Sequence, residues 1–177
     1  RSSMQTFPRS RRVFQESMIT WLTDKLWVKS LIKRHLGVSD GKILFSDHHL
    51  SHAASAFLCS PFDCAAILTV DGVGEWATAT YGVGEGTDIR ITREIRFPHS
   101  LGLLYSAFTA FLGFEVNEGE YKVMGMAPYG EPKSTDKVKK MINLNRDGSF
   151  SLNMDYFSYH YSAHKSYNDK FLREFGE

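Results

Sequence analysis

The sequence predicts an α/β protein in which helices pack on a mixed β-sheet. Three observations favour this class: apolar residues at helical spacing near the start of the chain, a continuous apolar run at 64–70, and two segments rich in β-formers at 76–82 and 89–97. A β-like run at 42–46 precedes a helical segment and then the apolar run, so a strand–helix–strand order is expected. Such a sheet would combine parallel and antiparallel pairing.

The composition is that of a folded globular chain. Its 177 residues are 42% hydrophobic and 14% aromatic, and the formal net charge of +1 gives no reason to expect nucleic acid or a membrane surface as a partner. Basic residues gather near the start of the chain, where they could face phosphate, but a solvated helix face explains them more simply. No apolar run approaches the roughly 20 residues of a membrane span and no signal peptide is visible, so a cytoplasmic protein is expected.

The first part of the chain is expected to hold a helix and a short strand. Apolar residues recur at helical spacing from Phe14 to Leu36, and Gly37 offers the stop signal. The run at 42–46 predicts a strand, and a second helix is expected over 48–57.

The main sheet should follow. The run at 64–70 is typical of a central strand that is covered on both faces. Cys59 and Cys64 border it, and because two cysteines at this spacing form neither a disulfide framework nor a zinc ribbon, both are expected to be reduced core thiols. The segments at 76–82 and 89–97 predict an antiparallel meander.

A helix that is apolar on nearly every side is expected over 101–112, packed on the sheet and ended by Gly113. Ser100 can cap this helix, and His99 is interpreted as a helix-start residue. The next segment, 117–130, interleaves charged residues with glycines and predicts a tethered loop. Weaker signals predict a helix near 133–142, a turn at 145–148 and a short strand at 149–153.

The most informative motif is a histidine pair. If Asp47 caps the helix that follows it, His48 and His52 are i, i+4 neighbours on one face, close enough to hold a single metal ion. Asp71, where the buried strand ends, is the candidate third ligand. His49 points about 100° away from its neighbours and is interpreted as a surface residue or one that supports the ligands from behind. The alternative for the pair is a solvated helix face.

A glycine-rich turn follows Asp71. Gly72 and Gly74 would let backbone N–H groups approach a phosphate, and the alternative is a tight hairpin. Because this turn directly follows Asp71, we favour contact of the turn with a phosphate over the tight hairpin. Glu75 either assists or is a surface turn residue.

Four motifs in order carry a resemblance to a known family. The stretches at 48–57 (HHLSHAASAF), 70–75 (VDGVGE), 97–102 (FPHSLG) and 118–130 (EGEYKVMGMAPYG) together resemble the NodU/CmcH-type O-carbamoyltransferases. The resemblance covers most of the chain, and four motifs in order are far more specific than any one of them.

The resemblance implies a ribonuclease-H-like lobe of the actin and hexokinase superfamily. In such proteins carbamoyl phosphate and ATP first yield carbamoyl adenylate in a second domain. The metal-bearing lobe then passes the carbamoyl group to a hydroxyl of a small molecule such as a sugar or an antibiotic.

The resemblance also assigns residues. His48, His52 and Asp71 fall on metal positions of the family, with iron(II) or zinc as the expected ion and Mg²⁺ as a further candidate beside ATP. Catalytic roles are implied for Asp71 and Lys122, and Lys122 could hold phosphate as a point charge. Cofactor contacts are implied for Gly72, Gly74, Glu75, Glu118 and Lys122. The alternative for the Glu118, Glu120 and Lys122 segment is an ion-paired loop that braces the buried helix.

Residues 1–177 are expected to be a partial N-terminal carbamoyltransferase domain. The family's first β-hairpin is not found ahead of Arg1, and the distal ligand, most of the adenosine pocket and the carbamoyl-phosphate domain would lie beyond Glu177. Exposed apolar surface, and with it a homo-oligomer, is therefore expected.

Two other functions stay open from the residues alone. One is an ATP-dependent kinase or phosphohydrolase of the same superfamily, and the other is a non-catalytic binding module. A kinase needs no histidine pair, because its Mg²⁺ prefers oxygen ligands, so His48 and His52 favour the transferase.

Overall fold

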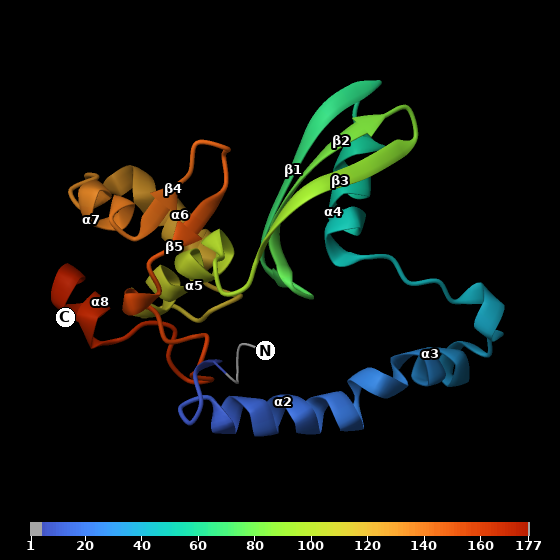
Figure 1. The fold of residues 1–177 in the computed structure, drawn as a ribbon, viewed down its shortest axis with the longest axis horizontal. Helices are drawn as coiled ribbons and strands as arrows, with labels where there is room; N and C mark the ends of the chain where they lie inside the picture. Colours follow the sequence, from blue (N-terminus) through green and yellow to red (C-terminus); the bar gives the residue numbers. More distant parts are fainter. Residues whose placement is uncertain (1–4, 177) are drawn as a thin grey trace. The chain divides into compact units, whose positions relative to one another are not determined.

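The computed structural model of the chain describes residues 5–176, which form two compact units. One unit comprises the chain up to Asp47 together with His160–Ala163, and the other comprises His48–Tyr159 and the chain from His164 onward (Figure 1). The histidine pair and Asp71 both lie in the second unit.

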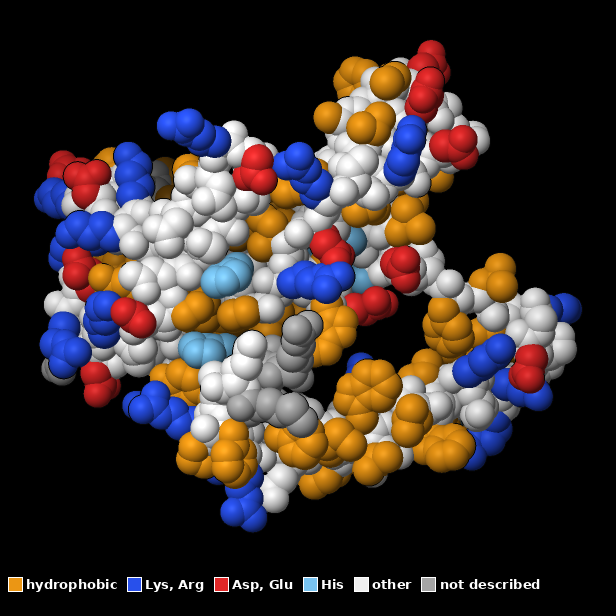
Figure 2. All heavy atoms as spheres, viewed as in Figure 1, with side chains coloured by type: hydrophobic (Ala, Val, Ile, Leu, Met, Phe, Trp, Pro, Cys, Tyr) orange, Lys and Arg blue, Asp and Glu red, His pale blue; other side chains and the backbone are white. Residues whose placement is uncertain are grey.

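The first unit is helical. Its elements are α2 (Arg11–Thr23), η1 (Lys25–Trp27), α3 (Val28–Leu36) and η2 (Asp40–Lys42). Gly37 ends α3 in the left-handed conformation, with φ at 63°, which confirms the predicted stop. The predicted strand at 42–46 is wrong, because this run has no partner strand among the described residues, and Leu44 is 91% exposed. Large apolar side chains of α2, Ile19 and Trp21 among them, stay exposed to solvent (Figure 2).

The second unit is built around a three-stranded meander. Its first elements are α4 (His48–Phe57), β1 (Cys64–Gly74), β2 (Ala77–Glu85) and β3 (Asp88–Arg96). The strands pair antiparallel in the order β1-β2-β3, which confirms the meander. The predicted mixed sheet is wrong, since parallel pairing is found nowhere in residues 5–176.

Strand β1 lies at an edge of this sheet, so the prediction of a central strand covered on both faces is also wrong. Its burial alternates, and the side chains of Leu68 and Val70 are 62% and 48% exposed. A continuous apolar run predicts a strand, but it does not indicate whether one strand or two strands pair with it.

Helix α4 covers one face of the meander. Ala53 and Phe57 are buried there against Ile67 of β1. The Phe57 ring lies so close to Gly84 of β2 that any side chain at Gly84 would collide with it. This packing fixes α4, and therefore the histidine pair at its start, on the sheet.

A second core joins the meander to the rest of the unit. The remaining elements are α5 (Leu101–Phe111), α6 (Glu120–Met126), η3 (Ala127–Tyr129), α7 (Thr135–Lys139), β4 (Ile142–Leu144), β5 (Phe150–Leu152), η4 (Met154–Tyr156) and α8 (Asp169–Phe175). Phe157, Phe171 and Met141 are fully buried and pack with Leu104 and Ala107 of α5. The predicted helix over 101–112 is confirmed, as is the hairpin turn between β4 and β5.

Two further predictions need correction. The segment 117–130 is not a loop throughout, because α6 and η3 form within it. Cys59 and Cys64 are free thiols as predicted, but both are exposed, since the turn after α4 runs over the surface.

Across residues 5–176, no helix combines the length and the apolar character that crossing a membrane requires.

Candidate metal centre

A bulge in β1 presents Asp71. The strand pairs regularly with β2 up to Val70, opposite Ala79, and pairing resumes at Gly74, opposite Ala77. Residues 71–73 therefore lie opposite a single residue of β2. Such a bulge bends the strand and redirects its side chains, which turns Asp71 toward α4.

The start of α5 holds this bulge in place. Ser100 is fully buried, and its hydroxyl lies 2.6 Å from the Gly72 carbonyl oxygen and 3.1 Å from the Asp71 carbonyl oxygen. The same oxygen accepts the N–H of Leu103 at 3.0 Å, so Ser100 caps α5 as predicted. A side chain at Gly102 would collide with the backbone of Asp71 and Gly72. Ser100 and Gly102 therefore join the helix directly to the site.

Three potential ligand atoms converge at the bulge. His48 Nε2 lies 2.6 Å from Asp71 Oδ2, His52 Nε2 lies 3.0 Å from His48 Nε2, and His52 Nε2 lies 3.5 Å from Asp71 Oδ2. Partial burial opposes ionisation of Asp71, but the Gly72 N–H and the two imidazoles outweigh it and lower the pKa of this carboxyl. Asp71 is therefore a carboxylate at neutral pH.

This geometry fits a metal ion. Atoms bound about 2.0–2.2 Å from a tetrahedral metal lie about 3.3 Å from each other. The three distances between the ligand atoms, 2.6, 3.0 and 3.5 Å, bracket that value. Among residues 5–176, His48, His52 and Asp71 form the one group of at least three His, Cys, Asp or Glu side chains whose ligand atoms lie close enough together to hold a single ion.

His49 has a different role from its neighbours. It is 5% exposed, and its Nε2 lies 2.9 Å from the Ala77 carbonyl oxygen, so this nitrogen carries the proton. Nδ1 then accepts the Thr69 hydroxyl at 2.6 Å. His49 thus ties α4 to β1 and β2, which orients His48 and His52 from behind.

The glycines after Asp71 have distinct environments. A side chain at Gly74 would collide with the rings of His48 and His49, so a glycine is needed there for the histidines to pack. At Gly72 an added methyl group would meet only Leu103, at 3.9 Å. Glu75 is exposed in the turn between β1 and β2, with φ at 62°. The close approach of Gly74 to the histidines was not predicted from the sequence.

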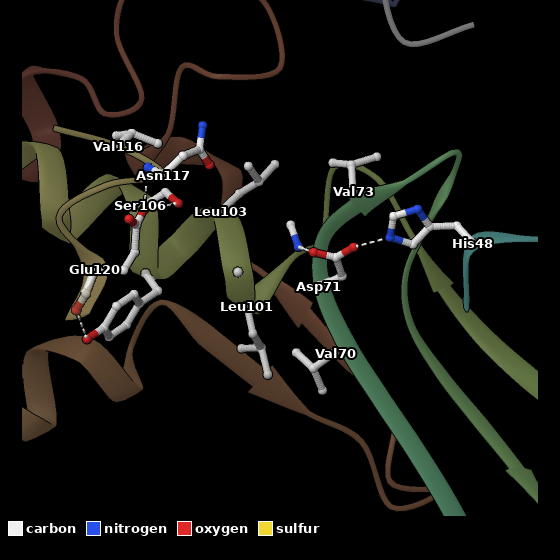
Figure 3. A pocket seen from close by; sticks show the side chains of 13 residues that line it. His48, Val70, Asp71, Val73, Leu101, Leu103, Ser106, Val116, Asn117 and Glu120 are labelled. Atoms are coloured by element: carbon white, nitrogen blue, oxygen red, sulfur yellow. Dashed lines mark hydrogen bonds and ion pairs between the residues drawn. The ribbon is translucent and has the colours of Figure 1, made fainter. Parts of the chain in front are cut away.

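A hollow of about 900 Å³ opens beside Asp71 and His48 (Figure 3). Its apolar walls and its polar groups come from β1, α5 and the segment that leads into α6. The lining residues are His48, Val70, Asp71, Gly72, Val73, Leu101, Gly102, Leu103, Tyr105, Ser106, Val116, Asn117 and Glu120.

The charged residues at the start of α6 lie partly in the hollow and partly at the protein surface. Glu120 lines the hollow, and its Oε1 accepts the Ser106 hydroxyl at 3.0 Å and the Asn117 N–H at 3.1 Å. Glu118 and Lys122 are exposed and do not line it. Glu120 thus braces α6 against α5, as the structural alternative expected, but through hydrogen bonds rather than an ion pair.

Several residues of this site escaped prediction. The sequence alone does not indicate that Ser106 and Asn117 belong to the site, and it indicates Glu120 only as part of the motif at 118–130. These residues come together because α6 folds back on α5, and no local spacing in the sequence indicates that contact.

Comparison with known proteins gives the family. The chain is 53% identical over 160 residues to an uncharacterized protein of Synechocystis, covering 86% of the chain and 26% of that protein. It is 38% identical over 146 residues to nodulation protein NolNO of Sinorhizobium fredii, and the match covers 81% of the chain and 21% of that protein. It is 36% identical over 112 residues to nodulation protein NolO of Bradyrhizobium diazoefficiens, and this match covers 62% of the chain and 20% of that protein.

The chain spans about a quarter or less of the length of these curated relatives. The family model described as carbamoyltransferase N-terminus matches residues 3–177, which is nearly the whole sequence. The chain with the His48, His52 and Asp71 cluster therefore belongs to the carbamoyltransferase N-terminus family.

Proposed function

We propose that this chain forms the metal-holding part of an ATP-dependent O-carbamoyltransferase. In this proposal a carbamoyl group from carbamoyl phosphate passes, through carbamoyl adenylate, to a hydroxyl of a small molecule. The observation that carries the proposal is the convergence of His48, His52 and Asp71 beside the hollow, in a chain of the carbamoyltransferase N-terminus family.

The donor set suits iron(II) or zinc. Two imidazole nitrogens and one carboxylate oxygen, from His48, His52 and Asp71, would hold the ion, and such mixed sets are typical of zinc and non-haem iron sites. A bound ion of this kind supplies a Lewis acid that can polarise a carbonyl or phosphoryl oxygen. Mg²⁺ prefers oxygen ligands, so the two imidazole ligands disfavour a kinase-type Mg²⁺ site at these residues.

The chain's own residues prepare the site for transfer. Ser100 and Gly102 hold the Asp71 backbone, and His49 holds the helix that carries the histidines. The apolar side chains of Val70, Leu101 and Leu103 in the hollow would pack against the bound donor and acceptor and so help to hold the acceptor hydroxyl beside the metal ligands.

We also propose how the donor is held. Lys122 and Glu118 would contact the nucleotide-linked donor from outside the hollow, with Gly72, Gly74 and Glu75 near its phosphate. In the same proposal the protein uses ATP with Mg²⁺, folds as a ribonuclease-H-like lobe, forms a homo-oligomer and is cytoplasmic.

Transfer of labelled carbamoyl from carbamoyl phosphate, assayed with the full-length protein against sugars, nucleosides and antibiotics, tests this function. Asp71→Asn keeps the shape of the side chain but removes its charge, so transfer should fall by about 100-fold or more while the thermal midpoint changes little. Asp136→Asn, at an exposed position of α7, is the matched control and should transfer normally. Phosphorylated rather than carbamoylated products would identify a kinase instead.

A further inference from the structure

We propose that Thr69 and Thr80 are positioning residues of the metal centre. Their hydroxyls form a buried chain of hydrogen bonds with His49, and this chain sets the place of helix α4 relative to Asp71 before any metal ion binds. The role rests on the proposed function, because it concerns how tightly the centre holds its ion. It extends the centre to two strand residues that offer no ligand atom.

The chain of hydrogen bonds runs from β2 through β1 to α4 and back to β2. Thr80 of β2 and Thr69 of β1 lie opposite each other in the sheet, and their Oγ1 atoms are 2.6 Å apart. Thr69 Oγ1 is also 2.6 Å from His49 Nδ1. On the other side of the ring, His49 Nε2 lies 2.9 Å from the Ala77 carbonyl oxygen. One imidazole thus links both strands.

With a neutral imidazole, each hydrogen bond in this chain has one possible direction. A carbonyl oxygen can only accept, so the proton of the last bond is on His49 Nε2, and Nδ1 accepts. The single proton of the Thr69 hydroxyl is then donated to His49, so Thr80 must donate to Thr69. The two threonines therefore favour one tautomer and one orientation of the ring.

The members of the chain lie in a buried place where they depend on each other. Thr80, Thr69 and His49 are 2%, 7% and 5% exposed. A buried hydroxyl or ring nitrogen that loses its partner finds no water in its place, so removal of one member weakens the others. Apolar side chains of the same shape would fill this place without that cost. The hydroxyls are therefore the part of these side chains that needs a functional reason.

The chain connects the two halves of the metal centre. His49 belongs to α4, the helix that carries both histidine ligands, so its ring holds that helix in place. Thr69 lies two residues before Asp71. Ala77 lies opposite Gly74, where β1 pairs with β2 again after the bulge. The two partners of the ring thus lie on either side of the bulge that presents Asp71.

Such positioning matters because three ligand atoms must meet at one ion. The nitrogens of His48 and His52 and the carboxylate of Asp71 lie 2.6 to 3.5 Å from one another. Moving displaced ligands back into this arrangement costs binding free energy. Replacement of residues that orient metal ligands typically lowers the affinity about 10–100-fold. The threonine hydroxyls should therefore raise the metal affinity without touching the ion.

A purely structural role for the two threonines makes a different prediction. If the bond between Thr69 and Thr80 only joined β1 to β2, its loss would lower stability and leave metal binding unchanged. Thr69→Val keeps the shape of the side chain but removes the hydroxyl. Thr69→Ser keeps the hydroxyl but removes a buried methyl group, which lowers stability. Only a positioning role predicts that the serine variant retains its metal affinity while the valine variant does not.

The experiment titrates the full-length protein with Co²⁺ in the presence of a competing chelator and records the visible absorption, which reports the geometry of the Co²⁺ ligands. Thr69→Val should weaken Co²⁺ binding about tenfold or more and change the absorption band. Thr80→Val should act in the same direction by a smaller factor, because Thr69 can still donate to His49. Thr69→Ser should bind almost as tightly as the wild type.

Thr109→Val is the matched control. This threonine of α5 is also fully buried, and its hydroxyl donates to the Tyr105 carbonyl of the same helix at 3.0 Å. Loss of this hydroxyl should lower stability but leave the affinity for Co²⁺ and the absorption band unchanged.

Unchanged Co²⁺ affinity in both valine variants would overturn the positioning role, and so would a loss of affinity that Thr69→Ser does not restore. An equal loss in Thr109→Val would trace the effect to general destabilisation and would overturn it as well. A wild-type protein that binds no Co²⁺ would contradict the metal centre and this role together. Absence of carbamoyl transfer beside Thr69-dependent Co²⁺ binding would contradict the transferase but leave the positioning role intact.

Discussion

Gly102 approaches Asp71 so closely that a methyl group on it would lie 2.7 Å from the Asp71 carbonyl oxygen. Gly102→Ala must therefore push α5 away from the bulge in β1. We expect it to lower the free energy of unfolding by about 1–3 kcal/mol, as overpacking does, and to weaken metal binding as well. Denaturant unfolding and a metal titration of the same preparation measure both effects.

Gly125 provides the control for that substitution. It lies inside α6, and a methyl group on it would meet no atom within 4 Å. Gly125→Ala should therefore leave metal binding unchanged and raise the free energy of unfolding by up to about 1 kcal/mol, because alanine favours a helix. Equal effects of the two substitutions would show that Gly102 is not specifically required beside Asp71.

Substitution of His49 should affect the fold more than metal binding. His49→Ala removes a buried ring and its hydrogen bonds to the Thr69 hydroxyl and the Ala77 carbonyl, although Thr69 keeps its bond to the Thr80 hydroxyl, and it should lower the free energy of unfolding by about 2–4 kcal/mol. The folded variant should still bind one metal ion at saturation, because the ligands His48, His52 and Asp71 are retained, with an affinity lowered about tenfold by the loss of the residue that orients the histidines. A variant that is fully stable but free of metal would place His49 among the ligands.

His99 should make stability depend on pH. Its ring is half-buried, and burial lowers the pKa of its imidazole, while Nδ1 lies 3.1 Å from the Leu152 N–H of β5. Its contribution is fully present above about pH 6.5, the pKa of the unfolded state, and is lost as the pH falls through the lower folded pKa. His99→Asn keeps an acceptor for Leu152, so unfolding measured at about pH 8 and about pH 5.5 should show a smaller loss than the wild type. An identical pH profile would contradict this assignment.

Lys122 tests the proposed contact with the donor. Its side chain is exposed on α6, and its Nζ lies 5.8 Å from the centre of the Tyr121 ring. If it holds a phosphate of the donor, Lys122→Ala should raise the KM for ATP more than it lowers kcat, with stability within about 0.5 kcal/mol of the wild type. Steady-state kinetics and a denaturant melt of the full-length protein decide this. An unchanged KM would remove Lys122 from the proposed donor site.

The sequence predicted the local parts of the site well. The i, i+4 spacing of His48 and His52 places both imidazoles on one helix face, and the structure brings Asp71 to them. Ser100 also caps α5 as its position before an apolar helix indicated. These features depend on neighbours within a few residues, where helix geometry leaves few alternatives.

Features that depend on distant partners were not predictable. The apolar run of β1 does not tell whether one or two strands pair with it, and the run at 42–46 looks like a strand although no partner is found among the described residues. The roles of Gly74 against His48 and of Glu120 against Ser106 arise from tertiary packing between separate elements. Periodicity and motif spacing carry no information about such contacts.

Metal titration of the protein and of a His48→Ala, His52→Ala double variant tests the central claim most directly. The wild type should bind one zinc or iron(II) ion, and acid should weaken the binding because protons compete with the metal for the ligand atoms. His35→Ala, which removes an exposed histidine of α3, is the control and should bind as the wild type does. The double variant should bind at least about 100-fold more weakly. Wild-type affinity in the double variant would contradict the metal centre and the function proposed from it.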